Sequence, residues 1–378
     1  MAHDYEIAVV GAGLVGLATA RALLQGRPNL RLAVYEKEPA VARHQSGHNS
    51  GVIHSGLYYA AGSLKAQLCR EGREELLRFA VEKDIPHRIT GKLVVAVDDT
   101  ELSRLEELRR RGEANGLQGL RELADWKEIE PHVRGVRALH VPETGSIDYR
   151  LVAAAYAEDV RALGGDLLLG RPVRSPADLP AERVVVCAGL QADRLAGRTE
   201  PRIVPFRGDY YVLSPRAARL VRGHVYPVPD PDFPFLGVHF SRRIDDQVWA
   251  GPNAVPSLAR EGYGRLRFDT RDALDVIRSP GLWRLARRYW RTGASEIWRD
   301  VVKRAAVREM RRYLPELRSR DVRFGPSGIR AQLLSRDGTL VDDFLLEQEG
   351  RVLHVLNAPS PAATASLAIG RRIAAQLE

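Results

Sequence analysis

The stretch YEIAVVGAGLVGLATARALLQG, residues 5–26, decides the fold predicted for this chain. A short apolar run rich in β-forming residues leads into a glycine-rich loop, and a run of good helix formers follows. The loop matches G-x-G-x-x-G through Gly11, Gly13 and Gly16. In this motif the first glycine permits a tight turn, the second lets the backbone approach a pyrophosphate, and the third lets helix and strand pack closely. The stretch therefore predicts a strand, a dinucleotide-binding loop and a helix.

A second strand is predicted at residues 31–38, which completes a β-α-β unit. Glu36 lies near its end, 36 − 16 = 20 residues after Gly16. A carboxylate at this spacing accepts hydrogen bonds from a ribose, while the free N–H groups at the positive helix end hold the phosphates. The alternative is an ordinary glycine turn without a ligand. The pattern does not separate FAD from NAD, because both contain the same adenosine diphosphate half.

The rest of the chain shows two kinds of pattern. Apolar residues at helical spacing over 148–165 precede apolar strand candidates at 166–170 and 183–189, and 351–377 again reads as strand, turn and helix. Segment 203–252 instead holds runs of alternating character, which are typical of half-buried antiparallel strands.

The predicted fold class is therefore α/β: a Rossmann-like nucleotide-binding domain with an α+β substrate or cap domain that contains a mainly antiparallel sheet. The nucleotide-binding domain is expected to be discontinuous. It is assigned to residues 1–85, 145–200 and 321–378, and the cap domain to residues 86–144 and 201–320.

Composition and cysteine content narrow the class of protein. The chain has 378 residues, 44% hydrophobic and 28% charged, which is enough for two domain-sized cores. Cys69 and Cys187 are far apart and match no metal or redox spacing, so no metal site and a reduced, cytoplasmic setting are expected. The N-terminal residues lack a positively charged region, and glycines break the first apolar run. Neither a secretory signal nor a membrane span is predicted.

The formal net charge of +9 indicates an anionic partner, which can be a nucleic acid, an acidic membrane surface or a small anion. Residues 278–320 carry 13 Lys or Arg against 4 Asp or Glu, so this basic segment alone has 13 − 4 = +9. Its tryptophans and tyrosines alternate with the basic residues, which is typical of a helix lying on anionic lipid. The competing interpretation is a solvated, charged helix pair whose tryptophans pack on the cap core.

The stretch HNSGVIHSGLYY, residues 48–59, is small and polar and would make a poor core strand and a poor amphipathic helix. Four further blocks follow it along the chain: PFRGDYY (205–211), FLGVHFSRR (235–243), GPNAV (251–255) and NAPSPAATASLAIG (357–370). Together these blocks resemble the L-2-hydroxyglutarate oxidase or dehydrogenase family, within the FAD-dependent superfamily of D-amino-acid oxidase and glycerol-phosphate dehydrogenase. The resemblance extends over nearly the whole chain.

This resemblance implies an FAD enzyme that oxidises L-2-hydroxyglutarate to 2-oxoglutarate by hydride transfer from C2 to flavin N5. It also implies a quinone or oxygen as electron acceptor, and a membrane quinone would make sense of the basic segment in peripheral contact with the cytoplasmic face of an anionic membrane. An amine, D-amino-acid or glycerol-phosphate oxidoreductase on the same scaffold is the first alternative. A flavin-dependent RNA-modifying or nucleic-acid-binding protein ranks low, and no nucleic-acid partner is expected, because no RNA-binding module is visible.

The resemblance also implies which residues contact the cofactor. Residues 48–59 would run past the flavin, and residues 184–189 would form a second strand beside it. Ser360 followed by Pro361 predicts the N-cap and first turn of the final helix, whose positive end would face the pyrimidine edge of the flavin. The alternative for residues 46–51 is a well hydrogen-bonded loop in which one or two side chains touch the ligand. The predicted cofactor-binding residues are Gly11, Gly13, Gly16, Glu36, Arg43, Ser46, His48, Asn49, Ser50, Gly189, Pro359 and Ser360.

His54 is the predicted catalytic residue. Oxidation of a secondary alcohol requires the hydroxyl proton to leave as hydride departs, and a neutral imidazole is suited to accept that proton near neutral pH. The related glycerol-phosphate enzymes carry a histidine in a comparable segment. The alternative is a structural histidine bonded to a backbone carbonyl.

A substrate with two carboxylates needs two cationic or hydrogen-bonding anchors, and the planar fork of arginine pairs with a carboxylate through two parallel bonds. Most arginines in such a basic chain simply keep the surface solvated, which is the alternative for each candidate. The predicted substrate-binding residues are Arg330, Tyr58, Tyr59, Arg207, His239 and Arg242, with Tyr210 as a further hydroxyl donor.

Overall fold

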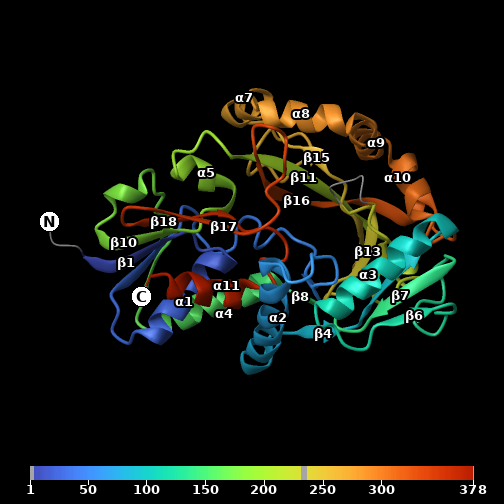
Figure 1. Ribbon diagram of the computed structural model, residues 1–378, viewed down its shortest axis with the longest axis horizontal. Coiled ribbons are helices and arrows are strands. Elements are labelled where there is room, and N and C mark those ends of the chain that lie inside the picture. The colour runs from blue at the N-terminus through green and yellow to red at the C-terminus, as the bar shows by residue number, and fades with distance from the viewer. Residues whose placement is uncertain (1–3, 231–235, 378) are drawn as a thin grey trace.

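The computed structural model describes residues 4–230 and 236–377 (Figure 1). Phe235, the first residue of the predicted block FLGVHFSRR, lies outside the described residues, as do residues 1–3 and 378 of the predicted nucleotide-binding domain. Within the described residues, none of the helices has both the length and the apolar character needed to span a bilayer.

The first sheet has the strand order β17-β18-β10-β1-β2-β9. Its strands are β1 (Tyr5–Val10), β2 (Leu32–Tyr35), β9 (Asp166–Leu168), β10 (Ala181–Val186), β17 (Leu345–Glu349) and β18 (Val352–Asn357). Five of the six run parallel, and β17 is antiparallel to β18. Strand β10 therefore lies between β1, the first strand of the chain, and β18, which is near the C-terminus.

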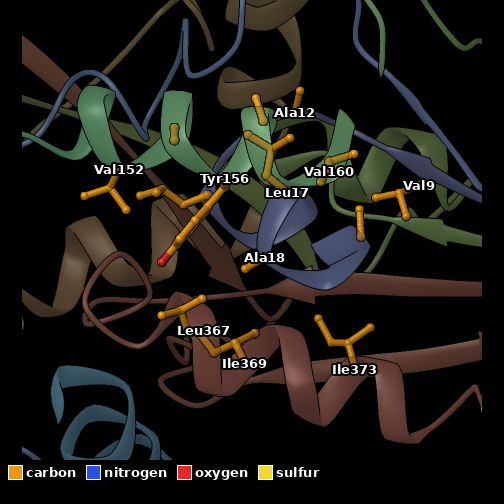
Figure 2. Packing of buried hydrophobic residues seen from close by; sticks show 14 of the residues in the cluster. Val9, Ala12, Leu17, Ala18, Val152, Tyr156, Val160, Leu367, Ile369 and Ile373 are labelled. Atoms are coloured by element: carbon orange, nitrogen blue, oxygen red, sulfur yellow. The ribbon is translucent and has the colours of Figure 1, made fainter. Parts of the chain in front are cut away.

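Helices cover one face of this sheet: α1 (Leu14–Gly26), α4 (Tyr149–Ala162) and α11 (Ser366–Ala375), with α2 (Leu64–Glu82) packed on α11. Because side chains alternate along a strand, Ile7 and Val9 of β1 belong to the core beneath these helices. Ala8 and Val10 belong to a separate cluster. Figure 2 shows Leu17 of α1 and Tyr156 of α4 in the first core, with the apolar residues of α11 nearby.

The second sheet is larger and mainly antiparallel, in the order β15-β11-β14-β13-β12-β5-β7-β6, with β16 paired to β11; only β5 and β12 are parallel among its described pairs. Its strands are β5 (Lys92–Ala96), β6 (Arg121–Leu123), β7 (Arg137–Val141), β11 (Arg202–Leu213), β12 (His224–Pro227), β13 (His239–Arg242), β14 (Val248–Gly251), β15 (Val255–Pro256) and β16 (Val322–Leu334). A small third sheet joins β3 (Val52–Ile53), β8 (Gly145–Ile147) and β4 (His87–Ile89). The predicted α/β class with a mainly antiparallel second sheet is confirmed.

The remaining helices are α3 (Leu102–Ala114), α5 (Ala192–Leu195), α6 (Pro215–Ala218), α7 (Thr270–Ile277), α8 (Pro280–Arg288), α9 (Trp290–Val301) and α10 (Lys303–Met310). In Figure 1 helices α7 to α10 form an orange rim along the outer side of the second sheet. The domain boundaries stay a prediction. Residues 322–334, assigned to the nucleotide-binding domain from sequence, pair as β16 with β11 of the second sheet.

The predicted start of the last helix is wrong. Helix α11 begins at Ser366, and its N-cap position is Ala365, without a side-chain cap. The residues before it form turns, in which Ala362 N–H donates to the Pro359 carbonyl and Ala365 N–H donates to the Pro361 carbonyl. Ser360 and Pro361 therefore belong to a turn, because these local bonds take the chain through 359–365 before the helix begins.

We expect Gly370→Val to lower the free energy of unfolding by about 3 kcal/mol, because it overpacks the contact between α11 and α1. A Cβ atom on Gly370 would lie 2.5 Å from the carbonyl carbon of Ala18. Urea unfolding of the purified protein measures the change. The matched control is Gly293→Ala in α9, where a Cβ meets nothing within 4 Å and the substitution should stabilise by up to about 1 kcal/mol. Equal effects of the two substitutions would contradict the packing argument.

Candidate active site

A large cavity begins at the carboxyl end of β1 and continues to the second sheet. Its volume is about 1430 Å³, compared with about 300–1,000 Å³ for the pocket of a drug-sized ligand. Its lining comes from the glycine loop, residues 42–60, the segment after β10, strand β16 and residues 355–363. The cavity has room for a dinucleotide and a small substrate together.

The glycine loop forms one end of this cavity through very close backbone packing. Gly11 has φ +106°, and a Cβ there would lie 2.4 Å from the Cys187 carbonyl oxygen. A Cβ on Gly16 would lie 1.9 Å from the Gly11 carbonyl oxygen, so helix α1 can start directly behind the loop only with glycine at this position. Gly11 and Gly13 line the cavity; Gly16 does not line it and serves the packing of helix on strand.

The start of α1 and the side chain of Glu36 complete the predicted dinucleotide site. The N-cap residue Gly13 provides no side-chain cap, and Leu14 N–H donates to Ser46 Oγ at 3.0 Å. Glu36 lines the cavity and accepts hydrogen bonds from Ala12 N–H at 2.8 Å and Glu38 N–H at 2.9 Å. Each carboxylate oxygen retains a second acceptor position, so the donor and acceptor set suits a ribose and a pyrophosphate.

The other predicted cofactor residues all reach the cavity, but several are also bonded within the protein. Arg43, Ser46, His48, Asn49, Ser50, Gly189, Pro359 and Ser360 belong to the lining. The Asn49 amide donates to the Gln45 and Ser46 carbonyls, and its oxygen accepts from Gly51 N–H, so Asn49 stabilises the loop itself. The His48 ring stacks on Tyr263 with centroids 3.7 Å apart, and burial lowers its pKa.

His54 follows the short strand β3 and lies in the same cavity. Its backbone N–H donates to Thr364 Oγ1 at 3.1 Å, which ties it to the segment before α11, and the Tyr149 hydroxyl bonds to the same Thr364 oxygen at 2.8 Å. Burial, with a smaller contribution from the charge of Lys92, lowers the pKa of His54 to about 4. The imidazole is therefore neutral near pH 7, which is the form that can accept a proton.

Five of the predicted substrate residues line the cavity: Tyr58, Tyr59, His239, Arg330 and Tyr210. Arg330 is carried by β16, and burial lowers its pKa. Burial likewise lowers the pKa of His239 to about 3, and its Nδ1 bonds to the Gly237 carbonyl oxygen at 2.9 Å.

Arg207 and Arg242 are absent from the lining of the cavity, so this cavity does not support their predicted binding of substrate, which stays a prediction. Arg207 bonds through Nε to Asp209 at 3.0 Å and through Nη2 to Asp300 at 3.2 Å. Arg242 donates to the Val221 and Ala218 carbonyl oxygens. Arg207 therefore ties β11 to α9, and Arg242 ties β13 to α6 and the turn after it.

Sequence reasoning missed Tyr226, Lys65 and Lys92. Tyr226 and Lys65 line the cavity, and Lys65 pairs with Asp342 at 2.9 Å. Lys92 lies behind the lining, on β5, and is only 3% exposed. Its signal in the sequence is a lysine at the head of the apolar run KLVVA, where a buried strand is otherwise expected.

Comparison with known protein families agrees with this fold and with the glycine loop. Residues 6–376 match the family described as FAD dependent oxidoreductase, abbreviated DAO. The chain belongs to this family, and its cofactor is FAD. The predicted cofactor and superfamily are confirmed, and the residues described above fit an adenine dinucleotide at the glycine loop.

Curated relatives are similar over nearly the full length. The chain is 46% identical to "L-2-hydroxyglutarate dehydrogenase, mitochondrial" of Nematostella vectensis, covering 98% of this chain and 90% of the relative. It is 43% identical to "L-2-hydroxyglutarate dehydrogenase" of Indibacter alkaliphilus, covering 97% of each chain. It is 44% identical to the mitochondrial enzyme of that name from Homo sapiens, covering 99% and 89%. The predicted family resemblance is confirmed.

Solved structures share the fold at lower identity. The L-alpha-glycerophosphate oxidase of Mycoplasma pneumoniae, with FAD bound, has a TM-score of 0.77 at 23% identity, covering 99% of this chain and 94% of that one. The glycine oxidase of Geobacillus kaustophilus has a TM-score of 0.70 at 20% identity, covering 98% and 94%. At these identities the likeness establishes the fold alone.

Proposed function

We propose that this protein is an FAD-dependent dehydrogenase that oxidises L-2-hydroxyglutarate to 2-oxoglutarate. The observation that carries the proposal is 43–46% identity to curated L-2-hydroxyglutarate dehydrogenases over 97–99% of the chain. The cavity supports it, because the same hollow is lined by the glycine loop, by the neutral imidazole of His54 and by the guanidinium of Arg330.

FAD, His54 and Arg330 have separate roles in the proposed reaction. FAD, when bound, supplies the acceptor for the hydride that leaves C2 of the substrate. His54 accepts the hydroxyl proton, so that the C–O bond becomes a carbonyl as the C–H bond breaks. Arg330 pairs with a substrate carboxylate and orients C2, and the cavity wall keeps water away from that ion pair.

The alternatives from the sequence are amine, D-amino-acid or glycerol-phosphate oxidation on the same scaffold. The fold neighbours include a glycerophosphate oxidase and a glycine oxidase, so the fold does not choose among these reactions. The substrate panel below separates them.

We expect purified protein to be yellow and to bleach when L-2-hydroxyglutarate is added without oxygen, because hydride transfer reduces the flavin. Absorbance near the flavin maximum measures the reaction. The panel also includes the D enantiomer, glycerol 3-phosphate, glycine and a D-amino acid. Bleaching by one of these other compounds, with none by L-2-hydroxyglutarate, would refute the assignment.

We expect His54→Ala to remain yellow and to lower the rate of flavin reduction by at least about 100-fold, because a general base typically contributes 10²–10⁴. In the wild type, the rate should fall as pH drops through about 4, where the imidazole gains a proton and can no longer accept one. Anaerobic stopped-flow measures both. The matched control is His132→Ala, a histidine paired with Glu316 at the surface, which should reduce normally. Normal reduction by the His54 variant would remove it from the mechanism.

Peripheral contact with an anionic membrane forms a second part of the proposal. Trp283, Trp290 and Trp298 of α8 and α9 are 61%, 63% and 61% exposed, which argues against the alternative that these tryptophans pack on the cap core. Exposed arginines lie on the same helices, including Arg287, Arg288 and Arg291. Aromatic and cationic side chains together suit the interface of an anionic bilayer, which would bring the flavin enzyme near a quinone.

We expect the holoprotein to co-sediment with vesicles that contain phosphatidylglycerol, less with neutral phosphatidylcholine vesicles, and less at high salt. Replacing Trp283, Trp290 and Trp298 by alanine should weaken binding to the anionic vesicles by at least about tenfold, because apolar area no longer enters the interface. The triple variant should still bleach with substrate. Equal binding of wild type and variant would contradict this contact, and salt-sensitive binding to RNA alone would favour the nucleic-acid alternative.

A further inference from the structure

Lys92 is a buried ammonium in an unusual setting. It lies on β5, beside His224 of β12 and Val141 of β7, and is 3% exposed. Its Nζ lies 4.3 Å from the centroid of the Tyr58 ring and 5.0 Å from that of Tyr226. Within residues 4–230 and 236–377, no carboxylate forms an ion pair with it.

An unpaired buried ammonium lowers the stability of the fold, so a role in binding a ligand would explain its presence. Moving an unpaired ammonium out of water is costly, and two aromatic faces recover only part of that cost. Burial lowers the pKa of Lys92 to about 7, opposed by a smaller effect of Cys69 on α2. Strongly perturbed groups of this kind concentrate at functional sites.

The two aromatic neighbours of Lys92 belong to the cavity wall. Tyr58 and Tyr226 both line the cavity, and so does His239, whose ring stacks on Tyr226 with centroids 4.1 Å apart. The Tyr58 hydroxyl is buried and has no hydrogen-bond partner among the described residues. The hydroxyl is enclosed by protein, so the rings of Tyr58 and Tyr226 form the part of the cavity wall that Lys92 contacts.

Lys92 and Arg330 are the cations described at this end of the cavity, and the titratable neighbours of Lys92 are histidines that stay neutral near pH 7. Its charge contributes to the lowered pKa values of His54, His224 and His239, which are about 4, 3 and 3. These groups come from the segment after β3, from β12 and from β13, and Cys69 faces Lys92 from α2. No carboxylate is among them, and Arg330 adds a further cation to the wall. This end suits a ligand with two negative charges.

We propose that Lys92 is the specificity-determining residue for the second carboxylate of the substrate, acting from behind the Tyr58 and Tyr226 rings. The inference rests on the proposed function, in which Arg330 holds the carboxylate next to C2. The ammonium of Lys92 attracts the charge of the remote carboxylate through the two rings, across a medium with little water. A ligand with one carboxylate does not benefit from this second interaction, so Lys92 selects dicarboxylates over monocarboxylates of the same length.

The test uses oxidised holoenzyme and two unreactive ligands, glutarate and pentanoate, whose binding is followed by the change in flavin absorbance. We expect Lys92→Met to weaken glutarate binding by at least about tenfold and to change pentanoate binding by less than about twofold. The wild-type preference for glutarate should also decline from about pH 6 to about pH 8.5, as Lys92 loses its proton, and should be flat in the variant. His54, His224 and His239 titrate well below this range.

Thermal unfolding separates this role from a structural one. Lys92→Met removes an unpaired buried charge and should leave the melting temperature unchanged or higher. Lys92→Gln replaces it if the methionine variant fails to retain FAD. An unchanged glutarate-to-pentanoate preference in a variant that retains FAD, or a wild-type preference that does not vary between about pH 6 and about pH 8.5, overturns the proposal.

The binding test of Lys92 and the test of the proposed reaction can fail separately. Anaerobic bleaching of the wild type by L-2-hydroxyglutarate tests the function, whereas neither glutarate nor pentanoate can be oxidised at C2 in this way. A wild type that is not bleached, with a variant that loses its preference for glutarate, would reject the function and retain Lys92 as a dicarboxylate-selecting residue.

Discussion

The close packing of backbone on backbone at the end of β1 is the constraint on which the rest of the site depends. Gly16 allows the first turn of α1 to contact the Gly11 carbonyl, and Gly11 in turn approaches the carbonyl of Cys187 beyond β10. No side chain larger than hydrogen fits at these contacts. They set the position of the helix start, the opening of the cavity and the place of Glu36 relative to both.

Much of the fold was predictable because its signals are local. The glycine loop, the apolar strands around it and the acid at the end of β2 all appear within the first part of the chain, and the α/β class follows from their order. The small, polar stretch around His54 was informative for a different reason. A segment unsuited to a core strand or an amphipathic helix, yet held inside the molecule, indicates that a ligand contacts it.

The errors arise where distant partners decide the outcome. Arg207, Arg242 and Arg330 look alike in sequence, but of the three only Arg330 lines the cavity, whereas Arg207 contacts Asp300 of α9 and Arg242 contacts carbonyl groups of α6 and the turn after it. The last helix starts later than its Ser-Pro pair suggested, because hydrogen bonds in the preceding turns compete with helix formation. Lys92 escaped notice because its significance depends on its burial against two aromatic rings, with no ion pair within residues 4–230 and 236–377, and spacing along the chain reveals neither.

The hydrogen bond from His54 to Thr364 has a consequence for how the protein is made. The backbone of a histidine encoded in the first sixth of the chain is held by a threonine near its end, and α1 packs on the final helix. During translation the early strands must therefore wait, incompletely covered, until the ribosome has released the last residues. FAD would then bind only after translation is complete. A nascent chain that stalls late would expose apolar surface to chaperones and would have no assembled cofactor site.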